Sequence, residues 1–435
     1  MFRSVVILGS LVLLGASLHQ ADAQAKGGIT FKPIADAYVT SAAPRSNFGR
    51  AKVLRARTSP VTRSYVRFGV AGLDAPVSSA IVRLFARTTS AVTLRAAGSS
   101  WSERRITFAN APRPGSVVGR SHVRRGRWLS IDVTRLVKGN GPVNLVITGT
   151  GKLASREARS SQPQLIVQAT APTLIAAGDI AYCGTPWDEA TAALVKNMPG
   201  TVAALGDLAY ESGSAAEFAA CYQPTWGAFK ARTRPAPGNH EYEADPTAAG
   251  YFGYWGARAG SPTQGWYSYE LGGWHLISLN SNCRYIGGCF AGSPQETWLR
   301  ADLSAHKTKC TLAYWHHPRF SGGQVTSEID MQPFWQDLYD ANADLVLTGH
   351  AHNYQRFAPQ TAAGVADPAR GIREFVVGTG GNPSLHPVAA IANTEVMNNT
   401  TWGVLQLALR NSGYDWHFVP VAGQSFTDSG SQACH

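Results

Sequence analysis

Short hydrophobic runs, many of them alternating with polar residues, follow one another along residues 28–170. They span residues 36–41, 52–58, 63–70, 79–89, 92–98, 127–134, 143–150 and 163–170. Gly, Pro, Ser and Asn separate the runs, and Arg alternates with Val, Leu or Phe in stretches such as IVRLFAR at 81–87. Because successive side chains of a strand face opposite sides, this pattern predicts an all-β sandwich.

Apolar runs alternate with amphipathic segments in the rest of the chain. Strands are expected at 173–179, 200–207, 273–280, 310–317 and 343–350, and helices at 186–197, 214–230, 293–305 and 328–342. Strands alternating with helices favour an α/β or α+β domain with its site at the strand carboxyl ends. We therefore expect domains at 24–170 and 171–435, joined near Pro172.

The first residues have the pattern of a signal peptide. Arg3 supplies positive charge, residues 5–18 are apolar, and the small-x-small sequence ADA occupies 21–23. This predicts a signal peptide over 1–23 with cleavage near Ala23, and hence a secreted, periplasmic or extracellular protein. The apolar run is too short to span a membrane comfortably, and no later run approaches that length.

The six cysteines all lie within residues 171–435: Cys183, Cys221, Cys283, Cys289, Cys310 and Cys434. In an exported chain an even number predicts three disulfides, whose connectivity the sequence leaves open. Cys283 and Cys289 are close enough for a local bridge, and Cys434 is placed to fix the C-terminal tail. The absence of C-x-x-C spacing disfavours a cysteine-bound metal.

Charge divides the chain in the same way as the hydrophobic pattern. Residues 24–170 hold 24 Lys and Arg against five Asp and Glu, whereas residues 171–435 hold 14 against 22. Such a basic domain is suited to an acidic polymer, for example a uronate polysaccharide, teichoic acid or extracellular nucleic acid. The alternative interpretation is a solvated arginine-rich face without a partner.

Five predicted strands or strand ends lead into polar residues of the kinds that bind metals. These are Asp179; Asp207 with Tyr210; Asn239 with His240; His316 with His317; and His350 with His352. Each one alone is more often a turn or packing residue. Together they lack a packing rationale, because so many polar groups are costly to bury without a partner. The set therefore predicts a metal centre, and its size indicates two ions bridged by a shared carboxylate, as in two-metal displacement at phosphorus.

The ordered motifs GD…GDxxY…GNHE…HxP…GHxH resemble the calcineurin-like metallophosphoesterases, and the Tyr resembles their purple acid phosphatase branch. The resemblance covers about residues 173–420 and implies a four-layer sandwich. It assigns Asp179, Asp207, Tyr210 and His352 to the first metal, and Asp207, Asn239, His316 and His350 to the second. It implies that His240 donates to the phosphate or leaving group. The β-rich stretch over roughly 28–170 resembles DNRLRE-type modules, which look like carbohydrate-binding modules.

One position departs from the family pattern. The first motif is usually D-x-H or D-x-G, but here it is Asp179-Ile180-Ala181. Alanine cannot bind a metal, so Tyr210 is the available donor for the first ion. A phenolate favours Fe(III), and the expected companion ion is Fe(II), Zn or Mn. His317, Arg319 and Tyr354 are candidate substrate-binding residues, with packing or ion pairing as the alternative for the first two.

The sequence thus predicts a secreted phosphatase that hydrolyses phosphate monoesters by attack of a metal-bound hydroxide, with His240 assisting the leaving alkoxide. A phosphodiesterase or nucleotide phosphoesterase with the same centre is the alternative among enzymes. A polyanion-binding surface protein with a relic catalytic domain is the alternative of another class.

Overall fold

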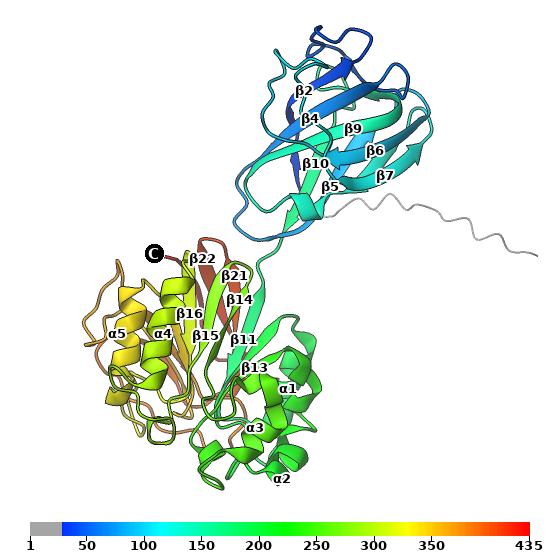
Figure 1. The fold of residues 1–435 in the computed structure, drawn as a ribbon. Helices are drawn as coiled ribbons and strands as arrows, with labels where there is room; N and C mark the ends of the chain where they lie inside the picture. The colour runs from blue at the N-terminus through cyan, green and yellow to red at the C-terminus, as the bar shows by residue number, and fades with distance from the viewer. Residues whose placement is uncertain (1–27) are drawn as a thin grey trace, which may run out of the picture. The chain divides into compact units, whose positions relative to one another are not determined.

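The computed structural model describes residues 28–435, which form two compact units (Figure 1). One contains residues 28–69, 79–133 and 144–168, and the other residues 70–78, 134–143 and 169–435. The predicted signal peptide at 1–23 lies outside the described residues. Within 28–435, no helix is long and apolar enough to cross a membrane.

The first unit is the predicted β-sandwich, built from two antiparallel sheets in the described residues. One sheet has the order β1-β10-β5-β8 and the other β2-β4-β9-β6-β7, with β3 paired to β9. The strands are β1 Ile29–Phe31, β2 Pro33–Thr40, β3 Val53–Ala56, β4 Thr62–Val70, β5 Val77–Phe85, β6 Ser90–Ala96, β7 Val117–Val123, β8 Trp128–Asp132, β9 Gly141–Ala154 and β10 Gln164–Ala169. Burial alternates along β5, as the Arg and hydrophobic alternation predicts.

The second unit contains two mixed sheets within the described chain. The first has the order β13-β12-β11-β21-β22-β23, and the second β14-β15-β16-β17-β19-β18-β20. Their strands are β11 Thr173–Ala177, β12 Thr201–Leu205, β13 Thr233–Ala236, β14 Tyr267–Leu271, β15 Trp274–Ser278, β16 Cys310–Tyr314, β17 Leu345–Thr348, β18 Tyr354–Phe357, β19 Arg373–Val377, β20 Thr394–Asn398, β21 Gly403–Arg410, β22 Gly413–Pro420 and β23 Ser429–Ala433. Strands β11, β12 and β13 run parallel, as do β15, β16, β17 and β19.

Helices cover the sheets and complete the α/β architecture. They are α1 Trp187–Asn197, α2 Ala215–Glu217, α3 Ala249–Trp255, α4 Pro294–Ala305 and α5 Gln332–Asp340. One core joins the two sheets, with Leu174 and Leu405 packing in the same cluster as Leu312. A second core joins α4 and α5 to β15 and β17 through side chains that include Leu299 and Trp335. The layers therefore follow the predicted order of helices, sheet, sheet and helices (Figure 1).

The helix predicted over 214–230 is wrong as a continuous element. Ser214 and Glu217 form a capping box at its start, but α2 is short and leads into a wider turn at Phe218–Tyr222. A separate 3₁₀ segment follows at Trp226–Arg232. Pro224 lies between them, where its missing N–H and its ring oppose a continuous helix.

The six cysteines form three disulfides, as predicted for an exported chain. The pairs are Cys183–Cys221, Cys283–Cys289 and Cys310–Cys434. The first joins the loop after β11 to the segment after α2. The last attaches the C-terminal tail to the start of β16, so both bridges tie segments that flank the strands leading to the candidate site.

Candidate metal centre

Parallel strands from both sheets deliver the predicted metal-binding residues. Asp179 follows β11 and Asp207 follows β12, both in the first sheet. His316 follows β16 and His350 follows β17, both in the second sheet. Asn239 lies in the loop after β13. The carboxyl ends of the two packed sheets therefore meet at one place, which is where α/β folds build their sites.

The backbone at these strand ends adopts an uncommon conformation. Asp179, Asp207 and His350 have positive φ angles of 60°, 51° and 66°, in the left-handed region that non-glycine residues rarely occupy. Gly206 has a φ of 83°, and a Cβ there would lie 2.5 Å from Nδ1 of His316. Such local strain concentrates at functional sites, and here it aims the side chains off the strand ends.

One group of atoms surrounds the Tyr210 hydroxyl. Its oxygen lies 3.1 Å from Oδ1 of Asp179, 3.3 Å from Oδ2 of Asp207 and 3.1 Å from Nε2 of His352. All four side chains are buried. These are the residues that the family resemblance assigns to the first metal.

A second group surrounds Nε2 of His316. This nitrogen lies 3.1 Å from Oδ2 of Asp207, 3.1 Å from Oδ1 of Asn239 and 3.2 Å from Nδ1 of His350. Oδ2 of Asp207 therefore belongs to both groups, which is the position a bridging carboxylate requires.

The hydrogen bonds of His316 and His352 fit bound cations. Nδ1 of His316 donates to the carbonyl of Leu205 at 2.8 Å, and Nδ1 of His352 donates to the carbonyl of Ser384 at 2.9 Å. In the neutral ring, each Nε2 then directs a lone pair at neighbouring oxygen atoms, an arrangement that a metal satisfies. Burial beside Asp179 and Asp207 raises the pKa of Tyr210 well above its usual value, so its ionisation calls for a nearby cation.

His240 lies beside the bridging carboxylate rather than within either group. Its Nε2 is 3.8 Å from Oδ2 of Asp207, while its Nδ1 contacts the carbonyl of Glu211 and lies 3.3 Å from the Glu243 carboxylate. The imidazole lines a cavity of about 420 Å³ that also exposes Tyr210 and His352. This cavity therefore borders the candidate centre on its His240 side.

The three candidate substrate-binding residues have different surroundings. His317 lies close to the centre, with its ring centroid 4.4 Å from that of His350 and its Nδ1 2.7 Å from the Ser281 hydroxyl. Tyr354 is wholly buried and donates to Asp428, so its hydroxyl is already engaged within the fold.

Arg319 is also buried, and its contacts are made within the fold. Its guanidinium donates to the carbonyl of Ala362 and covers the Phe320 ring. Its backbone N–H, like that of Phe320, donates to the buried carboxylate of Glu374. The side chain thus faces a loop and the core instead of the cavity that contains His240.

Glu241 is the last residue of the GNHE motif, and the sequence alone indicates no role for it. The Glu241 carboxylate accepts the backbone N–H groups of Asp207, Leu208 and Gly238 at 3.0, 2.7 and 2.6 Å. It therefore holds the bridging residue's loop against the Asn239 loop. His386 also adjoins the centre, with its ring stacked on His352 at a centroid distance of 4.0 Å.

The fold and the paired donor groups define a metallophosphoesterase architecture, and family models agree. Residues 28–169 match carbohydrate-binding module family 96, and residues 162–354 match the calcineurin-like phosphoesterase family. Residues 28–169 thus resemble the first family and residues 162–354 the second, and the second family implies a binuclear metal centre.

The curated relatives include purple acid phosphatases of Arabidopsis thaliana. Purple acid phosphatase 21 is 31% identical over 235 residues, which cover 47% of this chain and 49% of that protein. Purple acid phosphatase 18 is 29% identical over 236 residues, covering 48% and 50%. The chain spans about half the length of these relatives. A solved purple acid phosphatase from yellow lupin seeds aligns with a TM-score of 0.48 at 16% identity, covering 88% of this chain and 74% of that one.

Proposed function

We propose that this protein is a secreted binuclear metallophosphoesterase that hydrolyses phosphate monoesters. The observation that carries the proposal is the position of Oδ2 of Asp207, which lies within 3.3 Å of both the Tyr210 hydroxyl and Nε2 of His316. The match of residues 162–354 to calcineurin-like phosphoesterases supports the same reaction class.

Two ions would be held by the two donor groups. Asp179, Asp207, Tyr210 and His352 would hold Fe(III), because a phenolate is a hard, anionic ligand. Asp207, Asn239, His316 and His350 would hold Fe(II), Zn or Mn. When bound, such ions activate water and neutralise the charge that develops on the phosphoryl group.

His240 would assist the departure of the alcohol. With Nδ1 directed at the Glu211 carbonyl and the Glu243 carboxylate, the ring presents Nε2 toward the centre. A proton held at Nε2 can pass to the leaving oxygen, which avoids release of a free alkoxide. His317 lies beside His350, where it can donate to a phosphate oxygen.

The N-terminal module would hold the enzyme on an acidic polymer or a cell surface. Its match to carbohydrate-binding module family 96 supports a polysaccharide. The excess of 24 Lys and Arg over five acids in residues 24–170 favours a polyanionic one. Residues 28–169 would thus concentrate the phosphoesterase on its matrix.

Parallel assays on p-nitrophenyl phosphate and bis-p-nitrophenyl phosphate test the proposal on purified, metal-loaded protein. We expect faster hydrolysis of the monoester, two metals per chain and an absorption band in the visible. The variant Asp207→Asn should lose both activity and metal, because it alters the shared ligand. Hydrolysis confined to the diester would establish the phosphodiesterase alternative. Polymer binding without any hydrolysis would instead establish a relic catalytic domain.

A further inference from the structure

Two adjoining cavities extend from the His317 side of the candidate centre. The nearer one, of about 410 Å³, is lined by Asn239 and His317. The farther one, of about 760 Å³, shares Cys283, Arg284 and Asp330 with it. Because Cys283, Arg284 and Asp330 border both, the two cavities adjoin, and together they form a trough that starts beside Asn239 in the second group of metal-binding residues.

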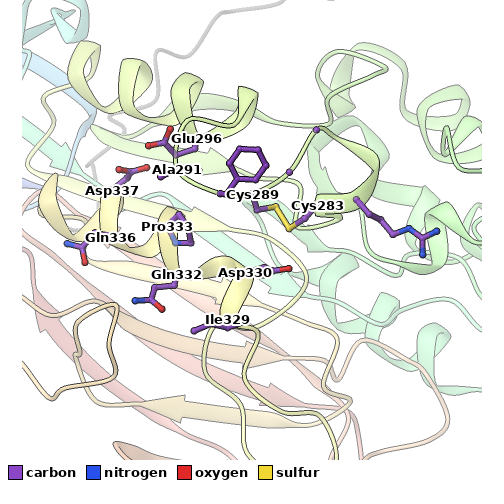
Figure 2. A pocket seen from close by; sticks show the side chains of 14 residues that line it. Cys283, Cys289, Ala291, Glu296, Ile329, Asp330, Gln332, Pro333, Gln336 and Asp337 are labelled. Carbon is purple, nitrogen blue, oxygen red and sulfur yellow. A yellow bond between two sulfur atoms is a disulfide. The ribbon is translucent and has the colours of Figure 1, made fainter.

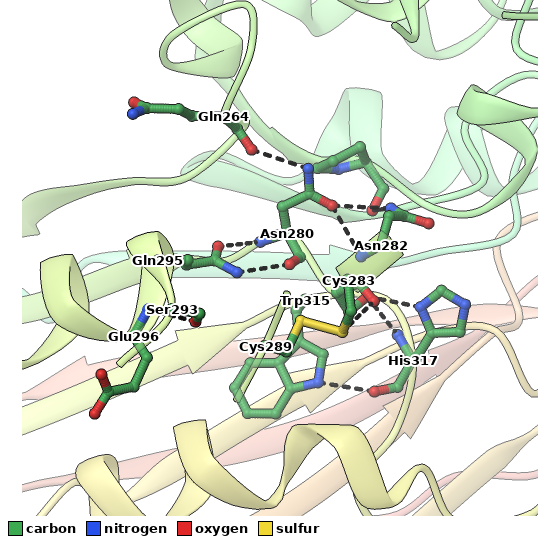
Figure 3. The surroundings of a disulfide bond; sticks show 12 residues. Gln264, Asn280, Asn282, Cys283, Cys289, Ser293, Gln295, Glu296, Trp315 and His317 are labelled. Atoms are coloured by element: carbon green, nitrogen blue, oxygen red, sulfur yellow. Dashed lines mark hydrogen bonds between the residues drawn. A yellow bond between two sulfur atoms is a disulfide. The ribbon is translucent and has the colours of Figure 1, made fainter. Parts of the chain in front are cut away.

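The loop that borders both cavities is held in place by a disulfide and by hydrogen bonds. The Cys283–Cys289 disulfide closes its loop, and Figure 3 shows this bridge beside Trp315, whose Nε1 donates to the carbonyl of His317. Gln295 exchanges two hydrogen bonds of 2.7 Å with the backbone of Asn280, at the foot of the same loop. A preformed wall of this kind lowers the entropy lost on binding.

The farther cavity presents hydrophobic side chains to solvent. Phe290 and Ile329 are 63% and 60% exposed, and Pro333 and Ala291 line the same space. Exposed large apolar side chains gathered at one cavity indicate a binding surface. An apolar body lying in the trough would cover them.

Acidic side chains occupy the end of the farther cavity away from the centre. Figure 2 shows Glu296 and Asp337 side by side there, with Cys283 and Asp330 toward the other end. Within the described chain, Oδ2 of Asp337 is buried and has no hydrogen-bond partner. Burial, together with the nearby Glu296 carboxylate, raises the pKa of Asp337 to about 7. An incoming cation would relieve the repulsion between these two carboxylates.

We infer that the trough binds the alcohol portion of the substrate, and that this alcohol carries an apolar body ending in an ammonium group. The inference rests on the proposed function and specifies its substrate class. The phosphate lies at the paired donor groups, the apolar body passes Arg284 and packs on Phe290 and Ile329, and the ammonium reaches Glu296 and Asp337. Arg300 contacts Glu296 at 3.5 Å from an exposed position, and Glu296 in turn adjoins Asp337.

A matched pair of substrates tests this inference. Both are phenyl phosphates with a para-alkyl chain, ending either in trimethylammonium or in its uncharged tert-butyl isostere, with butyl, hexyl and octyl spacers. At pH 8, where Asp337 is ionised, we expect one spacer length at which kcat/KM for the cationic substrate exceeds that of its isostere by about tenfold, because the trimethylammonium charge pairs with the partly buried carboxylate and the tert-butyl group cannot. The non-hydrolysable benzylphosphonates of the same pair, titrated by calorimetry, should show the same preference in Kd.

Two variants separate the charged and apolar parts of the trough. Asp337→Asn should bring the cation preference close to unity while leaving hydrolysis of p-nitrophenyl phosphate unchanged. Asp340→Asn, at an exposed position of the same helix, is the control and should keep the preference. Phe290→Ser should weaken the binding of the cationic and the uncharged long-chain compound equally.

The outcomes distinguish this inference from the proposed function. The inference is overturned if no spacer length gives a cation preference, or if the preference survives Asp337→Asn. In either case, hydrolysis of p-nitrophenyl phosphate would still support the proposed phosphoesterase activity. If that hydrolysis is absent, the proposed function fails, and the phosphonate titrations still decide whether the trough selects a cation.

Discussion

The Tyr210 hydroxyl has more polar neighbours than one hydroxyl group can satisfy by hydrogen bonding. Its hydroxyl carries one proton, yet it lies within 3.3 Å of two carboxylates and the lone-pair nitrogen of His352. Replacing it with phenylalanine removes the hard anionic donor from the first group. We predict that Tyr210→Phe loses the visible absorption band and binds iron about 100-fold more weakly, as measured by spectroscopy and metal analysis.

Tyr182 supplies a matched control for that substitution. Its ring centroid lies 6.1 Å from that of Tyr210 in the same cavity, but its hydroxyl belongs to neither donor group. Tyr182→Phe should keep colour and iron. An unaltered spectrum and iron content in Tyr210→Phe would reduce Tyr210 to a packing residue.

The position of His240 predicts a dependence on the leaving group. Loss of a general acid slows the departure of a poor leaving group far more than that of p-nitrophenolate, which needs no proton. We therefore predict that His240→Gln lowers kcat for alkyl phosphates by about 10²- to 10⁴-fold and for p-nitrophenyl phosphate much less. The exposed variant His417→Gln serves as the control. A uniform loss across leaving groups would place His240 in phosphate binding instead.

Strand β19 joins the loop after β16 to the end of β17 through the buried carboxylate of Glu374. Glu374 accepts the N–H groups of Arg319 and Phe320, after β16, and the hydroxyl of Thr348, at the end of β17. Burial raises the pKa of Glu374 from 4.5 to about 8 although these donors oppose the rise. The folded protein therefore holds a proton there that the unfolded chain has released.

That proton makes stability depend on pH with a definite sign. The stabilisation is complete below the unfolded pKa of 4.5 and is lost as pH rises toward about 8. We predict that the Tm of the wild type relative to Glu374→Gln falls by several degrees between pH 5 and pH 9, measured by calorimetry. Asp340→Asn should follow the wild-type profile. A constant difference across this range would show that Glu374 is ionised in the fold.

The sequence was most informative where one strand carried both a hydrophobic run and a polar terminus. The strands before Asp179, Asp207, His316 and His350 all form, because parallel strands buried on both faces read as continuous apolar runs. It failed for the antiparallel strands β18 and β20–β23, whose mixed burial gives no such run. The sequence also did not reveal the burial of Arg319 and Tyr354, since proximity in sequence to a metal-binding residue does not show which way a side chain faces.

For the whole molecule, the basic module offers a specific surface to test. Arg124, Arg125 and Arg127 are exposed in the turn between β7 and β8, and Trp128 follows with Arg83 4.9 Å above its ring. Cationic groups beside a half-buried aromatic such as Trp128 suit an acidic sugar polymer. We predict that replacing the three turn arginines with serine lowers the salt concentration at which the full-length protein elutes from immobilised polygalacturonate.

A charge-matched control removes three basic residues from the other unit. Arg300, Lys307 and Lys309 are exposed near the end of α4, so their replacement by serine changes the net charge equally. This triple variant should elute as the wild type does. If both variants elute at an equally lowered salt concentration, total charge rather than the module determines retention.

The Cys310–Cys434 disulfide closes a covalent ring around much of the catalytic unit. His316, His350 and His352 lie inside this ring, and Asp179, Asp207, Tyr210 and Asn239 lie outside it. A protease cut between residues 311 and 433 therefore opens the ring without releasing a fragment. Such a nicked molecule would run at full mass on a non-reducing gel and separate into two pieces once reduced, with its three histidine donors still tethered to the remainder until then.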